Sequence, residues 1–452
     1  MSKIEVDTID KQSGSTVTVG GPGTNLVLGT SGQSVTLGCG ATQTGFGRTG
    51  TVNWCTTVKT SPLTVASGNG YFINTSGGAV TVTLPSSPSA GDIVSVADYA
   101  GTSGTNNIIL ARNGSKFEGS CTNGALNNKR EAVTLIFIDS TQGWVAVSDN
   151  NELKLDISYI AASGGTETTS GDYKIHTFTA SSNFVVSSVG NAAGSNKVSY
   201  MVIAGGGGGG GDGGGGGGAG GFREGKCTSD PYADSPLDAG AGLPVSAQSY
   251  PITVGGGGNG NANSPWSSTP AAISGTPSVF SSITSTGGGG TSRAAGAAGG
   301  SGGGSGRCIQ SGTGGAGNTP PVSPPQGNTG GRGASGCGSG GGGGATVAGS
   351  NAPGNSAGAG GAGATSSING TPTARGGGGG GSAQPTSSGP AVRGAGGTGG
   401  GGAGAGSGTS GNQEAGTVNT GGGGGGGPAN APPHTGGAGG SGIVVIRYKF
   451  QN

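Results

Sequence analysis

The side chains best suited to binding lie in short stretches that interrupt long runs of glycine. They are aromatic residues and single arginines, which supply contact area and forked hydrogen bonds at modest cost in side-chain entropy. On a rigid support, such residues are a usual means of recognition. For Trp266 and Phe280 an equally good interpretation is a small satellite core, and any single arginine is more often a solvated surface residue. The candidate binding residues are Tyr232, Trp266, Phe280, Arg293, Arg307, Arg332, Arg375 and Arg393.

The residues needed for catalysis or metal binding are scattered. The two histidines, His176 and His434, lie far apart in the sequence, and no His/Cys/Asp cluster has metal-ligand spacing. An enzyme that cleaves glycans needs two carboxylates about 5 to 10 Å apart. Glu118, Glu131 and Asp139 could supply them, but scattered surface acids are the commoner explanation. The sequence therefore predicts a protein that is not an enzyme and that holds no cofactor or metal.

Charge and hydropathy exclude two classes of partner. Charged residues make up 9% of the 452-residue chain, with 20 basic and 19 acidic side chains, so no basic surface for nucleic acid is expected. No apolar run approaches the roughly 20 residues that span a bilayer, and residues 1–6 do not resemble a signal peptide. We expect no membrane insertion and synthesis in a cytosol.

The six cysteines contain no C-x-x-C pair, which argues against a zinc site and a disulfide framework. Mostly free thiols are expected. Cys308 and Cys337 are the pair to test first.

Glycine dominates the second half of the chain, where 88 of the 115 glycines fall between Ala204 and Gly442. Apolar strand-like runs open and close this block at residues 199–204 and 442–450. A linker would join two domains, whereas this block reads as one large insertion between two strands. We expect those strands to pair and to bring the two ends of the block together.

Four structures compete for the glycine block. Collagen needs glycine at every third position, and the unbroken runs at 205–211 and 421–427 violate that rule. Calcium-binding β-rolls need an aspartate in each nonapeptide, and the block has few. Disorder is the default for such a composition. We favour a bundle of polyproline-II-like helices, in which side-chain-free backbones lie close enough to bond to one another.

A nine-residue repeat opens the chain at Val17, Leu26 and Val35. Each unit has a short β element, a glycine and a polar turn, and it is too small to bury its own apolar pair. Stacked copies on a common axis would form a trimeric shaft; an ordinary β-meander is the alternative.

Two further β regions follow the repeat. Alternating β-branched residues with turns every 8 to 15 positions predict an antiparallel sandwich over residues 53–150. The sequence thus divides into an N-terminal attachment and repeat segment (1–52), that sandwich (53–150), a C-terminal β-domain (151–203 plus 443–452) and the glycine-rich insertion (204–442).

Five segments resemble known phage proteins. Tyr200-Met-Val-Ile-Ala-Gly-Gly-Gly-Gly, Gly220-Gly-Phe-Arg223 and Gly439-Gly-Ser-Gly-Ile-Val-Val-Ile-Arg-Tyr448 resemble the glycine-rich domain of bacteriophage tail fibres and adhesins. Residues 2–20 and 80–92 are similar to structural proteins of marine phages, cyanophages in particular. The resemblance implies an all-β protein with packed polyglycine II helices inserted in its C-terminal β-domain, and loops on these helices that contact a host receptor.

The sequence therefore predicts a virion tail fibre or adhesin, assembled in the host cytoplasm. We expect it to form a homotrimer, to join other tail proteins through its N-terminal segment, and to bind a bacterial polysaccharide or outer-membrane protein. The alternative is a purely structural virion fibre or tail-assembly protein that contacts no receptor.

Overall fold

The computed structural model describes residues 52–147, 154–155, 157–191, 193–261, 272–292, 295–307, 312–384, 391–406, 412–429 and 434–451. The chain divides into two compact units, unit 1 with residues 1–120 and 126–153 and unit 2 with residues 121–125 and 154–452. The described residues form strands and no helix, so the all-β prediction is confirmed for them, and they contain no helix able to cross a membrane. The nine-residue repeat lies outside the described residues.

Two sheets face each other in the first half of the chain. Sheet A has the order β1-β3-β5-β8-β9 and sheet B contains β7-β6-β4-β2. Apolar side chains from both sheets meet in one core, for example Val94 and Leu135 from sheet A with Val82 and Leu110 from sheet B. The strands are β1 (Asn53–Lys59), β2 (Leu63–Thr64), β3 (Asn69–Ile73), β4 (Val80–Thr83), β5 (Ile93–Asp98), β6 (Ile108–Ala111), β7 (Gly124–Leu126), β8 (Ala132–Phe137) and β9 (Trp144–Ala146).

The prediction that this sandwich is antiparallel is wrong for its first six strands. The pairs β1/β3, β3/β5, β2/β4 and β4/β6 are parallel, and only β5/β8 and β8/β9 in sheet A are antiparallel. From β1 to β6 the chain alternates between the two sheets, so it returns to each sheet in the same direction. Alternation of apolar residues marks one buried face and carries no information on strand direction.

Unit 2 contains a second sandwich, which is antiparallel. Sheet C has the order β11-β14-β18-β19-β20 and sheet D the order β12-β13-β23-β15-β16, with β17 paired to β15. The strands of these two sheets are β11 (Ala161–Ser163), β12 (Thr166–Ser170), β13 (Tyr173–Phe178), β14 (Ser182–Ser188), β15 (Lys197–Ile203), β16 (Phe222–Gly225), β17 (Leu243–Pro244), β18 (Ser249–Thr253), β19 (Ser278–Phe280), β20 (Ile283–Ser285) and β23 (Ile443–Lys449). Strands β21 (Ala364–Ser366) and β22 (Thr373–Arg375) form a separate hairpin, and β10 (Lys154–Leu155) pairs with β7 of sheet B.

Sheet D is buried on both faces. One face packs against sheet C, with Val202 and Val444 opposite Phe184 and Phe280. The other face, with Met201, is covered by Ala345, Ala364 and Ile368. Strand β23 pairs with β15 over residues 199–203 and 443–447, so the expected pairing across the glycine block is confirmed.

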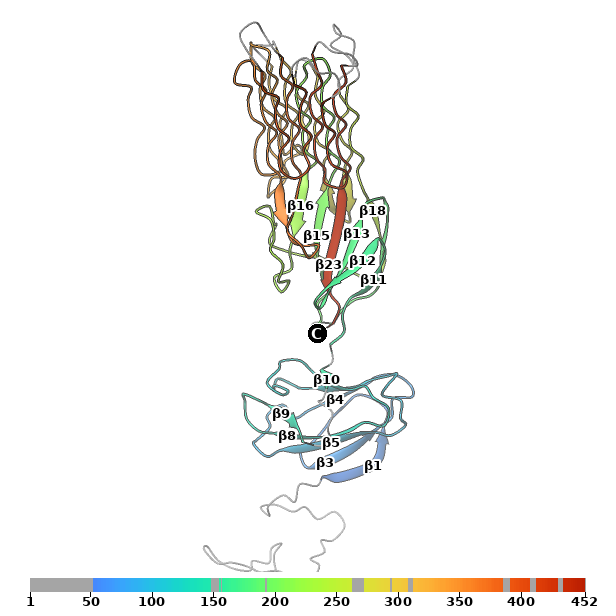
Figure 1. Ribbon diagram of the computed structural model, residues 1–452. Coiled ribbons are helices and arrows are strands. Elements are labelled where there is room, and N and C mark those ends of the chain that lie inside the picture. Colours follow the sequence, from blue (N-terminus) through green and yellow to red (C-terminus); the bar gives the residue numbers. More distant parts are fainter. Residues whose placement is uncertain are drawn as a thin grey trace, which may run out of the picture. The chain divides into compact units, whose positions relative to one another are not determined.

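The glycine runs continue the strands of unit 2 away from its cores (Figure 1). In the run after β15, successive backbone N–H groups turn to three neighbouring segments in rotation. The donor and acceptor pairs are Gly205 with Thr276, Gly206 with Gly440, Gly207 with Gly218, Gly208 with Ile273, Gly209 with Gly437 and Gly210 with Gly215, at 2.8–3.1 Å. Residues three apart therefore bond to the same neighbour, and the acceptor also shifts by three residues.

The same period of three occurs with parallel neighbours. In the run before the last turn, Gly424 and Gly427 donate to Gly207 and Gly210, at 3.0 and 2.7 Å. Here the residue numbers of donor and acceptor rise together, so the two runs are parallel. For the Gly205–Gly210 run the acceptor number falls as the donor number rises, so those neighbours are antiparallel. Each run is therefore joined to both parallel and antiparallel neighbours through backbone groups alone.

Side chains are excluded from these contacts. A Cβ added to Gly209 would overlap the carbonyl oxygen of Gly425, and one added to Gly217 would overlap that of Gly207. Such approaches lie far inside van der Waals distance, so the backbones would have to separate. The glycine composition follows from this close packing.

We expect Gly209→Ala to destabilise unit 2 by about 1–3 kcal/mol, because the methyl group forces packed backbones apart. Gly256→Ala is the matched control, since its Cβ would meet only Thr276 Oγ1, at 3.9 Å. The control should change stability by no more than about 0.5 kcal/mol. Differential scanning calorimetry of the full chain measures both. Equal shifts in the two variants would show that close packing does not constrain Gly209.

Candidate functional site

Several turns of the glycine block meet at its end remote from the sheets, which we call the far end (Figure 1). Asp212 and Gly213 form one of these turns, with φ of 51° and 74°. The Arg307 N–H donates to Gly213 O at 3.3 Å, and the Ser339 hydroxyl donates to the same oxygen at 2.6 Å. Hydrogen bonds between backbone and small polar side chains thus join these turns to one another.

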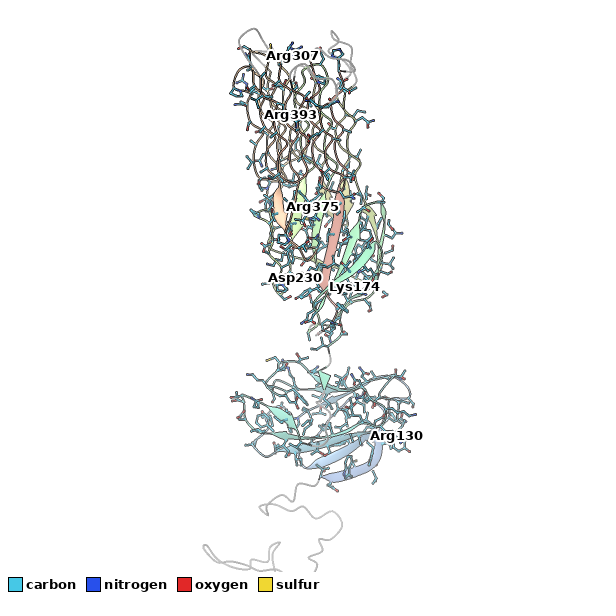
Figure 2. The ribbon with its side chains drawn as sticks, in the orientation of Figure 1. Arg130, Lys174, Asp230, Arg307, Arg375 and Arg393 are labelled. Carbon is cyan, nitrogen blue, oxygen red and sulfur yellow. The ribbon has the colours of Figure 1, made fainter. Side chains whose placement is uncertain are left out.

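Arg307 lies at the far end but is largely buried (Figure 2). It is 7% exposed, and its Nη2 lies 3.7 Å from Oδ1 of Asp212, which is 5% exposed. A Cβ on Gly213 would overlap the Arg307 side chain, so glycine is required beneath it. The guanidinium group therefore packs on the turn beside Asp212, and little of it is accessible to solvent.

Arg332 and Arg393 are the exposed arginines among the described candidates. Arg332 donates from Nε to Gly312 O at 3.4 Å, and its backbone N–H donates to Asn351 Oδ1 at 2.8 Å. Arg393 donates from Nη1 to Asn412 O at 2.9 Å and lies 3.3 Å from Glu414 Oε1. The exposed ion pair of Arg393 contributes little to stability, so this guanidinium group is accessible to a ligand.

Three candidates lie inside unit 2, away from its surface. Tyr232 belongs to the core on one face of sheet D, and Phe280 belongs to the core between sheets C and D. Arg375 on β22 is 6% exposed and interacts electrostatically with Glu224. These side chains cannot reach a ligand in this conformation, and Phe280 fills a full domain core, larger than the satellite core considered from the sequence. Trp266 and Arg293 lie outside the described residues.

A buried polar network holds the loop between β16 and β17 against sheet D. Arg447 on β23 and Asp230 in the loop are each 3% exposed and form an ion pair of 2.9 Å. The Ser199 hydroxyl donates to the second Asp230 oxygen at 2.9 Å, and the Arg447 guanidinium stacks over the Tyr173 ring at 4.5 Å. This network was not predicted from the sequence. Its signal was Arg447, a charged residue within the largely apolar β23.

Glu224 is the second buried acid of this region. It is 1% exposed, accepts from the Ser366 hydroxyl at 2.6 Å and from the Ser235 N–H at 3.0 Å, and burial raises the pKa of its carboxyl. These bonds connect β16 to the hairpin β21/β22. Glu224 and Asp230 are thus bound by structural partners.

The carboxylates considered for glycan cleavage each stabilise a local structure. Asp139 accepts from the Thr141 and Gln142 N–H groups, both at 2.7 Å, and Glu131 accepts from residues 127 and 128, both at 2.9 Å. Glu118 accepts from the Ala146 N–H at 3.3 Å. Within the described part of the chain, no three His, Cys, Asp or Glu side chains gather in a way that would bind a metal. Cys308 lies outside the described residues, so its pairing with Cys337 stays a prediction.

His176 is buried between sheets C and D. Its Nδ1 lies 2.7 Å from Gly164 O, and its Nε2 lies 3.1 Å from the Tyr448 hydroxyl. Burial lowers the pKa of this imidazole, and the smaller attraction of Glu167 does not compensate. The neutral ring is therefore the form that the fold accommodates.

A family model described as a glycine-rich domain matches residues 179–449, which is more than half of the chain. No curated protein sequence matches the chain. The matched segment begins next to β14 and ends at the last residue of β23. It therefore joins most strands of unit 2 and the whole glycine block in one module.

We expect Asp230→Asn to destabilise unit 2 by about 3–5 kcal/mol, because it leaves the Arg447 charge buried and unpaired. Asp234→Asn is the control, since Asp234 forms a partly exposed ion pair of 2.7 Å with Lys226. That change should cost about 0–1 kcal/mol. Denaturant unfolding of both variants gives the comparison. A small effect at Asp230 would show that the buried pair does not fix the loop.

His176 should make stability depend on pH. A base whose pKa is lowered by folding stabilises the protein above its unfolded pKa of about 6.5, and this contribution is lost as the pH falls below that value. We expect the unfolding free energy of the wild type to fall by up to about 1.4 kcal/mol per pH unit between pH 6.5 and 5. His176→Phe should remove this slope, and His434→Gln should keep it. A slope that survives in His176→Phe would assign it to other groups.

Proposed function

Because the chain belongs to the glycine-rich domain family, we propose that it is a tail fibre or adhesin of a bacteriophage virion. In this proposal the far end of the glycine block carries loops that bind a receptor on the host cell, either a polysaccharide or an outer-membrane protein. The observation that carries the proposal is the three-residue rotation of backbone hydrogen bonds among the glycine runs. It supports a stiff platform, which a recognition surface made of loops requires.

We further propose that the glycine runs are polyglycine II helices. A polyproline-II-type helix has three residues per turn and no internal hydrogen bonds, so its N–H groups point to three neighbours in succession. The bonds of Gly205–Gly210 to three segments follow this rule. The predicted overlap of an added Cβ with a neighbouring carbonyl explains why the helices are made of glycine.

The loops at the far end supply the chemistry for recognition. Arg332 is exposed there beside Gly333, whose N–H donates to Ser305 Oγ at 2.7 Å close to Arg307. The segment that contains Trp266 joins Asn261 and Ala272, which are bonded to Gly209 and Thr291. We propose that Arg332 and Trp266 bind a flat, polar ligand such as a saccharide or a peptide loop.

The other parts of the chain fit a fibre. We propose that residues 1–52 attach the protein to other tail proteins and join three copies, through the nine-residue repeat at Val17, Leu26 and Val35. This part of the proposal depends on the sequence alone. A virion component that serves only as a structural fibre is the alternative, and the following test separates the two.

We expect the double variant Trp266→Ala/Arg332→Ala to reduce adsorption of the purified protein to host cells by at least tenfold, because two anchoring side chains are lost. Val418→Ala is the matched control: Val418 is 67% exposed in a turn at the opposite end of a glycine run. Flow cytometry of cells with labelled protein measures adsorption. Unchanged adsorption of the double variant would contradict binding through these loops, and absent adsorption of the wild type would favour the purely structural role.

A further inference from the structure

Sheet A of unit 1 has one covered face and one open face. Alternate residues of its strands point into the core shared with sheet B, among them Ile73, Val96 and Leu135. The residues between them point outward on the open face. By strand alternation and register, the outward residues are Trp54, Gly70, Phe72, Ile93, Ser95, Ala97, Ala132, Thr134, Ile136 and Val145. Gly70, Ile93 and Ser95 among them are buried, and the other seven are half-buried or exposed.

This open face carries no charged side chain at these ten described positions. Three residues extend its alternation beyond the strand ends: Tyr99, Ile138 and Val147, whose N–H groups donate to Ile73, Gly143 and Thr134 at 2.8–3.0 Å. These three residues and Trp54 are 40–55% exposed, and they are the large hydrophobic side chains that are exposed in the described part of unit 1. Exposed apolar side chains that share one face of a sheet mark a site of association.

The strands themselves have the composition of strands covered on both faces. β5 and β8 read Ile-Val-Ser-Val-Ala-Asp and Ala-Val-Thr-Leu-Ile-Phe, and their one charged residue, Asp98, is 7% exposed, so neither strand has the polar outward face of a half-exposed strand. Within the same chain, β15 and β23 have similar sequences and are buried on both sides of sheet D. The open face of sheet A therefore has the residues of a covered face.

Trp54 makes this face flat. Its indole lies over Gly70, where an added Cβ would come within 2.7 Å of the ring, and it stacks on Phe72 with ring centroids 4.8 Å apart. Glycine beneath the indole lets the ring lie along the sheet. A flat face suits packing against another sheet at about 10 Å.

We propose that the open face of sheet A packs against the same face of a second copy of this chain. An uncharged face gains nothing from a charged partner, whose charges would lose their hydration on contact. The same face on another copy is neutral, apolar and flat, so the two surfaces match. This proposal adds a surface to the self-association proposed above for residues 1–52.

The size of the face sets the strength of the contact. Five strands spaced about 4.8 Å apart, each contributing about five residues of 3.3 Å, cover roughly 20 by 17 Å. This is roughly half of the 800 Å² per partner that a stable interface buries. We therefore expect a dissociation constant in the micromolar range for this contact.

The test is sedimentation velocity of the full chain from about 1 to 100 µM. The double variant Tyr99→Lys/Ile138→Lys places like charges in the contact, and Val392→Lys/Val418→Lys adds the same charge at positions that are each 67% exposed elsewhere. We expect the first variant to raise the dissociation constant at least tenfold and the second to leave it within a factor of two. Circular dichroism checks that both variants are folded.

Three results would overturn the inference. Equal association of the face variant and the wild type would leave only the N-terminal segment as the contact. A monomeric wild type at about 100 µM would contradict both contacts. A monomer that is retarded in gels containing dextran, and that loses this retardation in Trp54→Ala, would assign the face to a neutral polysaccharide. None of these results bears on adsorption through the far end, which the host-cell assay tests separately.

Discussion

Everything in the glycine block depends on hydrogen bonds between backbones that no side chain separates. Each buried N–H and C=O group needs a partner, and the run at Gly205–Gly210 finds its partners in three different segments. Fixing one residue costs about 1–2 kcal/mol in backbone entropy, and glycine loses more than any other residue. A single hydrogen bond contributes about 1 kcal/mol net. One pair of runs would therefore not be stable by itself, and the block is stable only when many runs form together.

The sandwich of unit 2 supplies what the glycine runs lack. The runs contain almost no apolar side chains, so their ends must be fixed by a hydrophobic core elsewhere. Strands β15 and β23 provide it, because they are buried on both faces and continue directly into the first and last runs. The pair Arg447–Asp230 fixes the loop on the outer face of sheet D. Removing the core would free the ends of the block, so the two parts form one folding module.

The sequence allowed the two β regions to be predicted, because alternating apolar residues and turns report directly on burial. Strands β16 to β20 were missed: they lie within residues 204–442, the stretch assigned to the glycine-rich insertion, and yet they belong to sheets C and D. It also predicted that β23 pairs with β15, since both are apolar runs at the two ends of one insertion. Strand direction in unit 1 was not predictable, because a parallel and an antiparallel strand alternate in the same way. The burial of Tyr232 and Arg375 was not predictable from the sequence. Their burial depends on contacts such as Arg375 with Glu224, which lie far apart in the sequence.

The three-residue period also determines which parts of the sequence can change in length. One residue added within a run would rotate every later N–H group by about a third of a turn, and each group would face a different neighbour. Only changes of three residues keep the partners, so the length of a run is tightly constrained. A loop that connects two runs is not bound to this period, because it needs only to join their ends. Under the proposed function, recognition can therefore change through the loops while the backbone hydrogen bonds that support them stay the same.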